Sequence, residues 1–282
     1  MRERRYPSDT TDAEWSLLEP LLPVPAWRTA RGGRPEAHPR REIVDAILYI
    51  VDNGAKWRSL PADFPPPWRT VFGFFARWAK DGTLPRIVDL LRRRIRLGTG
   101  RSPWPVALVV DSQSVKAANT VPRGTSGYDP AKKLTGRKRH LAVDLGGLLV
   151  DLLVTPADVP DRDGARRLLA RLHALHPEIT LVWADSAYAG DLVAWAEHEL
   201  RITLKIVKRP SGAEGFVVLP RRWVVERSLA WFMRARRNCR DYERLPAHAE
   251  AHLTWSAITL MLRRLTRRPP AAGPAVPGDQ AA

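Results

Sequence analysis

From residue 105 onward, the spacing of apolar residues changes from a helical pattern to a strand pattern. Four short apolar segments are expected to form buried strands: VALVVD, LLVDLLV, ITLVWAD and ITLKIV. The segment RKRHLAVD reaches LLVDLLV through Gly146 and Gly147, which is the pattern of a β-hairpin. Amphipathic helices are expected between the later strands, and a long helix is expected to begin at Pro220. This alternation predicts a mixed α/β domain.

The first hundred residues carry only helical patterns. Thr11 and Glu14 have the spacing of a capping box at the start of a helix. Further helices are expected near residues 43–53 and 68–81, followed by a fourth in RIVDLLRRRIRL. The expected organisation therefore has three parts: a small all-α module over residues 1–100, an α/β domain over residues 101–268, and a disordered tail rich in Pro, Gly and Ala over residues 269–282.

The composition indicates a polyanionic partner. The chain of 282 residues has a formal net charge of +16, a surplus that is typical of proteins that bind nucleic acid. No apolar run approaches the roughly 18 residues that a membrane span needs, and the start MRERRYPSDT lacks the apolar segment of a secretory signal. The single Cys239 excludes an internal disulfide framework and a cysteine zinc cluster. We expect a cytoplasmic protein with no membrane partner.

Three acidic residues are candidates for a metal-binding site. Asp111 and Asp185 each end a predicted buried strand, where open α/β sheets form their ligand crevice, and small polar residues follow both. Glu226 lies within an apolar helical segment, where a carboxylate needs a partner. The simpler alternatives are turn or capping roles for the two aspartates and a helical salt bridge between Glu226 and Arg222.

The segment around Glu226 is strongly basic. Between residues 221 and 244, eight arginines stand against three acidic residues, an excess that favours contact with a DNA backbone. On one continuous helix, Arg222, Glu226 and Arg237 would share a face, so Arg237 is expected to contact a phosphate, with Arg234 as the rival. Further candidate DNA contacts are Lys116 and the basic run of Arg137, Lys138 and Arg139.

Several blocks of the sequence resemble a known family. LVVDSQSVKAAN, GRKRHLAVDLGGLLV, VWADSAYAG and RRWVVERSLAWFMRARRNCRDYER resemble the catalytic half of bacterial insertion-sequence transposases of the insertion-sequence-five family. SDTTDAEWSLLEPLLP, RGGRPEAHPRREIVDAILYIVDNGAKWRSLP and PPWRTVFGFFARWAKDG resemble its N-terminal module, so that the likeness covers roughly residues 6–265. The order of predicted strands and helices is also that of the ribonuclease H-like fold.

The resemblance implies a DDE transposase whose acidic triad is Asp111, Asp185 and Glu226. It implies binding of the element's terminal inverted repeats, cleavage at the element ends and transfer of the 3′-hydroxyl ends to target DNA by two-metal-ion chemistry. Mg²⁺, with Mn²⁺ as a substitute, would be the cofactor. Double-stranded DNA would be the substrate, bound by a homodimer or higher multimer in association with the bacterial nucleoid.

One departure from the family pattern concerns the neighbours of Glu226. The broader family's signature is Tyr, two residues, Arg, three residues, Glu, six residues, Lys. Arg222 and Glu226 fit this signature, but Leu219 stands at the Tyr position and Met233 at the Lys position. Two other functions stay open: a cellular ribonuclease H-like nuclease or resolvase, and a DNA-binding protein derived from a transposase that no longer cuts.

Overall fold

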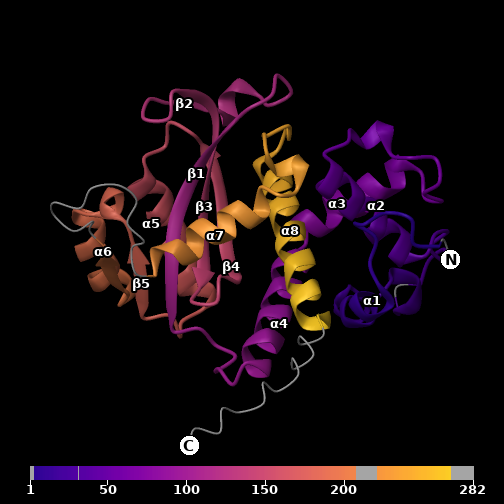
Figure 1. Ribbon diagram of the computed structural model, residues 1–282, viewed down its shortest axis with the longest axis horizontal. Helices are drawn as coiled ribbons and strands as arrows, with labels where there is room; N and C mark the ends of the chain where they lie inside the picture. The colour runs from indigo at the N-terminus through magenta and orange to yellow at the C-terminus, as the bar shows by residue number, and fades with distance from the viewer. Residues whose placement is uncertain (1–2, 31, 208–220, 268–282) are drawn as a thin grey trace, which may run out of the picture.

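A mixed β-sheet forms the centre of the computed structural model, which describes residues 3–30, 32–207 and 221–267 (Figure 1). The described strands are β1 (Ala107–Lys116), β2 (Gly127–Asp129), β3 (Leu134–Asp144), β4 (Leu149–Pro156), β5 (Leu181–Ala184) and β6 (Thr203–Ile206). Their order is β2-β3-β1-β5-β6, and β4 also pairs with β3. Strand β3 runs antiparallel to β1 and β4, whereas β1, β5 and β6 are parallel. The predicted hairpin and the other three predicted strands, β1, β5 and β6, are present, whereas β2 was not predicted.

Helices cover both faces of the sheet (Figure 1). The described α-helices are α1 (Asp12–Leu18), α2 (Arg40–Asn53), α3 (Trp68–Lys80), α4 (Thr83–Gly98), α5 (Asp161–Leu175), α6 (Asp191–Leu200), α7 (Arg222–Phe232) and α8 (Pro246–Thr266). Helices α5 and α6 pack on one face, and α7 and α8 lie on the other side, with α8 between the sheet and the N-terminal helices. The predicted capping box of α1 is confirmed, with Thr11 and Glu14 as its two members.

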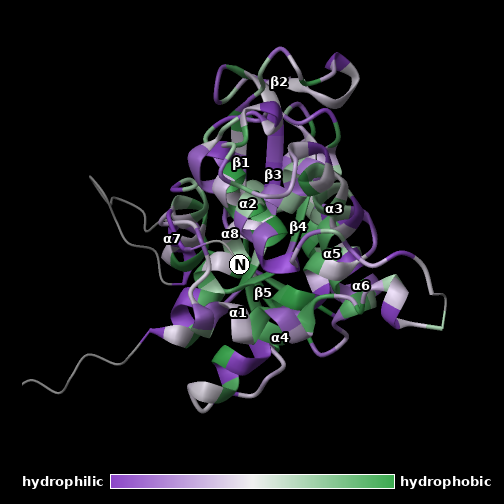
Figure 2. Cartoon of the chain, turned by 90° about the vertical axis from the view of Figure 1, so that its right-hand side faces the viewer, coloured by the Kyte–Doolittle hydropathy of each residue, from purple (hydrophilic) through white to green (hydrophobic). Residues whose placement is uncertain are grey.

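Alternate side chains of β1 enter two different apolar cores. Leu108 and Val110 join the core under α5 and α6, while Val109 joins the core under α7 and α8. Successive side chains of a strand point to opposite faces, so Asp111 shares the α7 face with Val109. In the view coloured by hydropathy, β5 between these layers is predominantly apolar (Figure 2). The strand pattern read from the sequence therefore also determines which helix the acidic residue faces.

The N-terminal helices share the core of the α7 face. Leu18 of α1, Ile47 of α2 and Trp78 of α3 belong to one apolar cluster with Val109 of β1 and Trp255 of α8. The rings of Trp78 and Trp255 lie 6.0 Å apart. The boundary near residue 100 was predicted from the change from helical to strand patterns, and one apolar core joins the two sides of that boundary. The division at residue 100 stays a prediction, and the tail at residues 269–282 lies outside the described residues.

The helix that carries Glu226 is shorter than predicted. Pro220, its predicted start, lies outside the described residues, and α7 ends at Phe232. The side-chain amide of Asn238 donates to the carbonyl of Phe232 at 3.0 Å and to the hydroxyl of Ser256 at 2.8 Å. These bonds hold a turn where the sequence pattern predicts further helix, so Arg237 does not lie on the helix of Glu226.

Arg237 forms a buried ion pair. Its guanidinium donates to the carboxylate of Glu243 at 2.6 and 2.9 Å and to the carbonyl of Ala55 at 3.0 Å. Burial opposes the charge of Glu243, but hydrogen bonding to His252 and the charges of His252 and Arg237 lower its pKa to about 2. The prediction that Arg237 contacts a phosphate from the face of Glu226 is wrong, because Arg237 lies beyond the end of α7 and its donors bond to Glu243 and Ala55.

We predict that Arg237→Ala destabilises the whole fold. Breaking a buried ion pair leaves Glu243 uncompensated, which costs about 3–5 kcal/mol in the free energy of unfolding. Urea denaturation at neutral pH measures this loss. The difference from wild type should shrink as the pH falls from 4.5 toward 2, because Glu243 then loses its charge.

The matched control for this prediction is Arg162→Ala. Arg162 faces Asp191 at 3.8 Å, and both side chains are more than half exposed, so its loss should cost below about 1 kcal/mol. A variant Arg237→Ala with wild-type stability would contradict the assignment.

Candidate active site

The register of β1 and β5 brings two aspartates together. Val109 of β1 pairs with Trp183 of β5 in parallel orientation. Asp111 and Asp185 each follow two residues later, so they lie side by side on the α7 face of the sheet. Asp185 follows directly after the end of β5, as predicted. Asp111 lies in the middle of β1 rather than at its end, because β3 continues to pair with the polar residues that follow it.

Helix α7 places a third carboxylate at the same point. Arg222 and Glu226 lie one helical turn apart, and Nη2 of Arg222 lies 3.2 Å from Oε1 of Glu226. The same nitrogen lies 3.7 Å from Oδ2 of Asp111 and 3.5 Å from Oδ2 of Asp185. One guanidinium nitrogen therefore lies among all three predicted triad carboxylates. The salt bridge that the sequence offered as an alternative to a triad coexists with the acidic cluster.

The aspartates are further held by backbone amides. The amide of Ser112 donates to Oδ1 of Asp111, and the amide of Ala187 donates to Oδ1 of Asp185, both at 2.8 Å. Burial raises the pKa of Asp111 to about 6, and repulsion from Asp185 and Glu226 adds to this, while the Ser112 amide and Arg222 oppose it. A buried carboxyl with two acidic neighbours favours a bound cation, and Arg222 supplies that charge here.

A buried polar layer supports this cluster from the opposite side. The hydroxyl of Ser112 donates to Asp161 at 2.8 Å, and Lys138 Nζ contacts the same carboxylate at 3.0 Å. Tyr188 is buried nearby, and burial followed by the charge of Asp111 raises its pKa well above 10.0. Asp161 thus holds Ser112, the residue next to Asp111, and Tyr188 packs beside them as a neutral buried side chain.

The donor set fits a divalent metal in its chemistry. Carboxylate oxygens are the ligands that Mg²⁺ and Mn²⁺ prefer. Among residues 3–30, 32–207 and 221–267, no group of three His, Cys, Asp or Glu side chains stands close enough to hold a metal ion. The three carboxylates instead surround Arg222. A metal held by Asp111, Asp185 and Glu226 would therefore compete with the guanidinium for the same oxygens.

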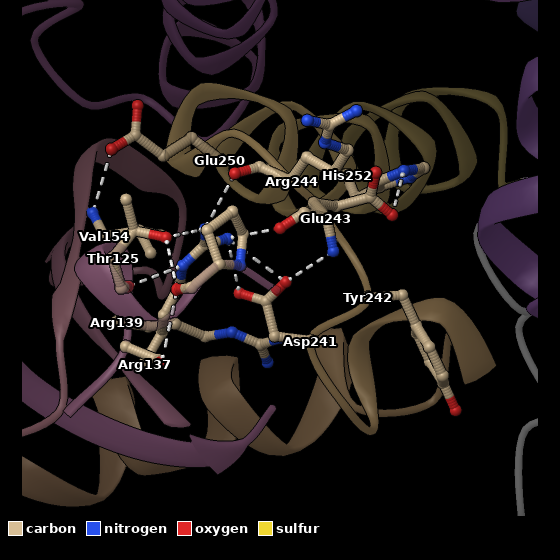
Figure 3. Close-up of polar contacts among 12 residues, drawn as sticks. Thr125, Arg137, Arg139, Val154, Asp241, Tyr242, Glu243, Arg244, Glu250 and His252 are labelled. Atoms are coloured by element: carbon tan, nitrogen blue, oxygen red, sulfur yellow. Dashed lines mark hydrogen bonds and ion pairs between the residues drawn. The ribbon is translucent and has the colours of Figure 1, made fainter. Parts of the chain in front are cut away.

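Several predicted DNA contacts are buried, and Figure 3 shows the polar partners of Arg137. Arg137 is fully buried and bonds to Asp241 at 3.2 Å, and Arg139 is 2 % exposed and donates to the carbonyl of Asn238 at 2.8 Å. Lys138 is also buried, in the layer beneath the active site. The prediction that these three residues face DNA is wrong, because segments packed on the faces of the sheet cover them. Asp241 and Asn238 bond to Arg137 and Arg139, and Asp161 contacts Lys138.

Other predicted contacts remain accessible. Lys116, at the end of β1, and Arg234, just after α7, are both exposed, and Arg222 lies in the acidic cluster. Three further exposed arginines, Arg263, Arg264 and Arg267 at the end of α8, were not predicted, although the basic run RRLTRR is a signal for them in the sequence. In the described part of the chain, no helix is long and apolar enough to cross a membrane.

A mixed sheet whose parallel strands and crossing helix collect three carboxylates at one point defines a class of DNA-processing enzymes with the ribonuclease H-like fold. The chain belongs to the family described as "Transposase DDE domain", whose model matches residues 105–262. A second family model, for transposases of the IS4/5 family, matches residues 10–88. The protein is thus a transposase, and the expected family is confirmed over both halves of the chain.

A curated relative supports the same assignment. The chain is 30% identical over 111 residues to a protein described as "Insertion element IS402 uncharacterized 16.2 kDa protein", from Burkholderia cepacia. The match covers 38% of this chain and 71% of the relative. The relative's description thus places a similar sequence in an insertion element.

We predict that Arg222 stabilises the metal-free protein. Arg222→Gln leaves three carboxylates facing one another without a counter-charge, and we expect a loss of about 1–3 kcal/mol in the free energy of unfolding in EDTA. Adding Asp111→Asn to Arg222→Gln should restore part of that loss, because it removes the most buried of the three charges. The two single variants and the double variant, compared by urea denaturation, measure this coupling.

Arg166→Gln is the matched control for Arg222→Gln. Arg166 contacts one exposed carboxylate, Asp191, at 3.2 Å. Its replacement should leave the free energy of unfolding within about 1 kcal/mol of wild type. Additive effects of Arg222→Gln and Asp111→Asn would contradict an electrostatic cluster.

Proposed function

We propose that this transposase binds the terminal inverted repeats of its own insertion sequence, cleaves DNA at the element ends and joins the freed 3′-hydroxyl ends to target DNA. The observation that supports the cutting step is the convergence of Asp111, Asp185 and Glu226 on a single point beside α7. Phosphodiester cleavage of this kind needs carboxylates that share metal ions at one phosphate. The substrate is double-stranded DNA of the nucleoid, in the bacterial cytoplasm.

Mg²⁺, or Mn²⁺ as a substitute, is the proposed cofactor, held by Asp111, Asp185 and Glu226. When bound, such ions would supply Lewis acidity to the attacking and leaving oxygens of the scissile phosphate. In this proposal the Arg222 guanidinium leaves the carboxylates when metal binds and contacts a non-bridging oxygen of the DNA backbone. A planar, permanently charged guanidinium suits both partners. Tyr188 and Asp161 keep the floor of the site in place during this exchange.

The proposed DNA path follows the exposed basic residues on either side of the carboxylates. Lys116 lies five residues beyond Asp111 on β1, and Arg234 lies just beyond α7. We assign end recognition to the helices before residue 100, because they are basic and precede the catalytic sheet. Pairing of two element ends requires at least two copies of the chain, so a homodimer or higher multimer is the proposed active assembly.

A derived DNA-binding protein that no longer cuts is the second candidate function. The observation that favours it is the contact of all three carboxylates with Arg222. A guanidinium that never leaves would exclude metal. The cleavage assay separates the two candidates.

We predict that Asp111→Asn, Asp185→Asn and Glu226→Gln each abolish cleavage of element-end DNA in Mg²⁺ and in Mn²⁺. End binding should stay within about threefold of wild type, because the changes remove metal ligands and leave the phosphate-binding residues intact. Gel assays of end-labelled duplex measure nicks, and filter binding in EDTA measures affinity.

Glu250→Gln provides a control carboxylate for these variants. Glu250 accepts a hydrogen bond from the amide of Val154 at 2.8 Å. It is not one of the three carboxylates that contact Arg222. Normal cutting by any one of the three triad variants would remove that residue from the triad.

We predict that end binding weakens steeply with salt. Each neutralised phosphate contributes a slope of about −0.9 in a plot of log K against log of salt concentration. Lys116→Gln should make that slope shallower by about 0.9, whereas Arg201→Gln, at the end of α6, should leave it unchanged. Equal slopes for Lys116→Gln and wild type would remove Lys116 from the DNA path.

A further inference from the structure

A second basic site lies beside α7, where the ends of α7 and α8 meet the β3–β4 turn. Here the structure contains a pocket of about 400 Å³. Leu148 and Leu149 of the hairpin, with Leu260 and Met261 of α8, give it apolar walls. The volume falls in the range of small-molecule pockets and is far too small for a duplex.

The rim of this pocket is positively charged. Its described lining contains the arginines Arg227, Arg234, Arg263, Arg264 and Arg267 and no acidic residue. In the described part of the chain, none of the five forms an ion pair, in contrast to Arg137, Arg171 and Arg237 elsewhere. Burial, and then repulsion from Arg264, lowers the pKa of Arg227. The pocket therefore concentrates charge that no described carboxylate neutralises.

Backbone groups and aromatic rings hold two of these guanidiniums in place. Arg227 and Arg264 both donate to the carbonyl of Gly146, each at 3.3 Å. Arg227 also stacks between Trp223 and Trp231, at 4.5 and 4.6 Å from the two ring centres. Its Nε atom is buried and has no hydrogen-bond partner. A fixed guanidinium with an unused donor beside an indole ring is suited to an anion attached to a planar group.

The β3–β4 turn lies close against this arrangement. Gly147 has a φ of +78°, and a Cβ atom there would lie 3.1 Å from Nη2 of Arg227 and 3.0 Å from the hydroxyl of Ser228. That hydroxyl donates to the carbonyl of Gly147 at 2.9 Å. Only glycine allows both the turn and the close approach, so the hairpin sequence keeps Arg227 in position.

We propose that this pocket binds one unpaired nucleotide of a single DNA strand, with its phosphate on Arg227 and Arg264 and its base against Trp231 and the apolar walls. Arg227 lies about 100° from Glu226 around α7, and Trp231 about 140°, so the pocket faces away from the carboxylates. It therefore holds a segment of DNA other than the scissile phosphate. The choice of DNA over other anions rests on the proposed function.

The test measures binding of short DNA to the full chain in EDTA, so that its readout does not depend on cutting. The probes are fluorescein-labelled single-stranded dT 12-mer, an abasic 12-mer with the same phosphates, and the matching dT·dA duplex. Trp231→Leu should weaken dT 12-mer binding about tenfold, the loss of one base stack, and leave the abasic strand within twofold. Arg227→Gln combined with Arg264→Gln should weaken both single strands at least tenfold.

The control pair for the two arginines is Arg167→Gln combined with Arg201→Gln. Both residues are exposed and lie outside the pocket lining, and the change in charge is the same. This control should bind both single strands within about twofold of wild type. Melting curves show that each variant is folded, and a misfolded Trp231→Leu would be replaced by Leu260→Asp, which makes the wall of the pocket acidic.

Three outcomes would overturn the proposal. The first is that the pocket pair and the control pair lose the same affinity for the single strands. The second is that Trp231→Leu loses the same affinity for the dT strand and for the abasic strand. The third is that poly-glutamate displaces the dT 12-mer as effectively as unlabelled DNA does. Failure of the proposed function would be seen separately, as absence of cutting by the wild-type chain in Mg²⁺.

Discussion

The parallel pairing of β1 with β5 determines where the acidic cluster can form. Register alone sets Asp111 beside Asp185, because each stands two residues beyond a paired position, Val109 and Trp183. A slip of one residue would turn one aspartate to the α5 face and into an apolar core. The apolar residues that alternate along β1 oppose such a slip, so the packing of the core and the position of the cluster have the same cause.

Once the aspartates are fixed, one helix completes the arrangement. Arg222 and Glu226 are separated by one turn of α7, so both reach the same side of the sheet. The guanidinium offsets the repulsion that three carboxylates would otherwise exert on one another. The acidic cluster thus contains an internal cation, Arg222, which contacts all three carboxylates.

Local patterns predicted most of the fold. The hairpin through Gly146 and Gly147, the capping box at Thr11 and the strands before Asp111 and Asp185 depend on neighbours in the sequence, and all are present. The predicted end points of β1 and α7 were wrong, because where each element ends depends on a partner distant in the sequence. Strand β3 extends β1, and the side chain of Asn238 helps to end the helical region.

The same limit applies to the candidate site. The three carboxylates could be found from their positions next to strands and on a helix, whereas the burial of Arg137, Arg139 and Arg237 could not. The partners of Arg137 and Arg139, which are Asp241 and Asn238, lie about a hundred residues further along the chain. Glu243, the partner of Arg237, lies across a turn that the sequence pattern does not reveal. A basic residue in a DNA-binding protein can equally serve an internal ion pair, and sequence alone does not separate the two roles.

The position of α8 in the shared core has a consequence for the order of folding during synthesis. The N-terminal helices bury Leu18, Ile47 and Trp78 against a helix that the ribosome makes after every described strand. Contacts of such long sequence separation form late. A nascent chain therefore has no finished core for its N-terminal helices until α8 has been made.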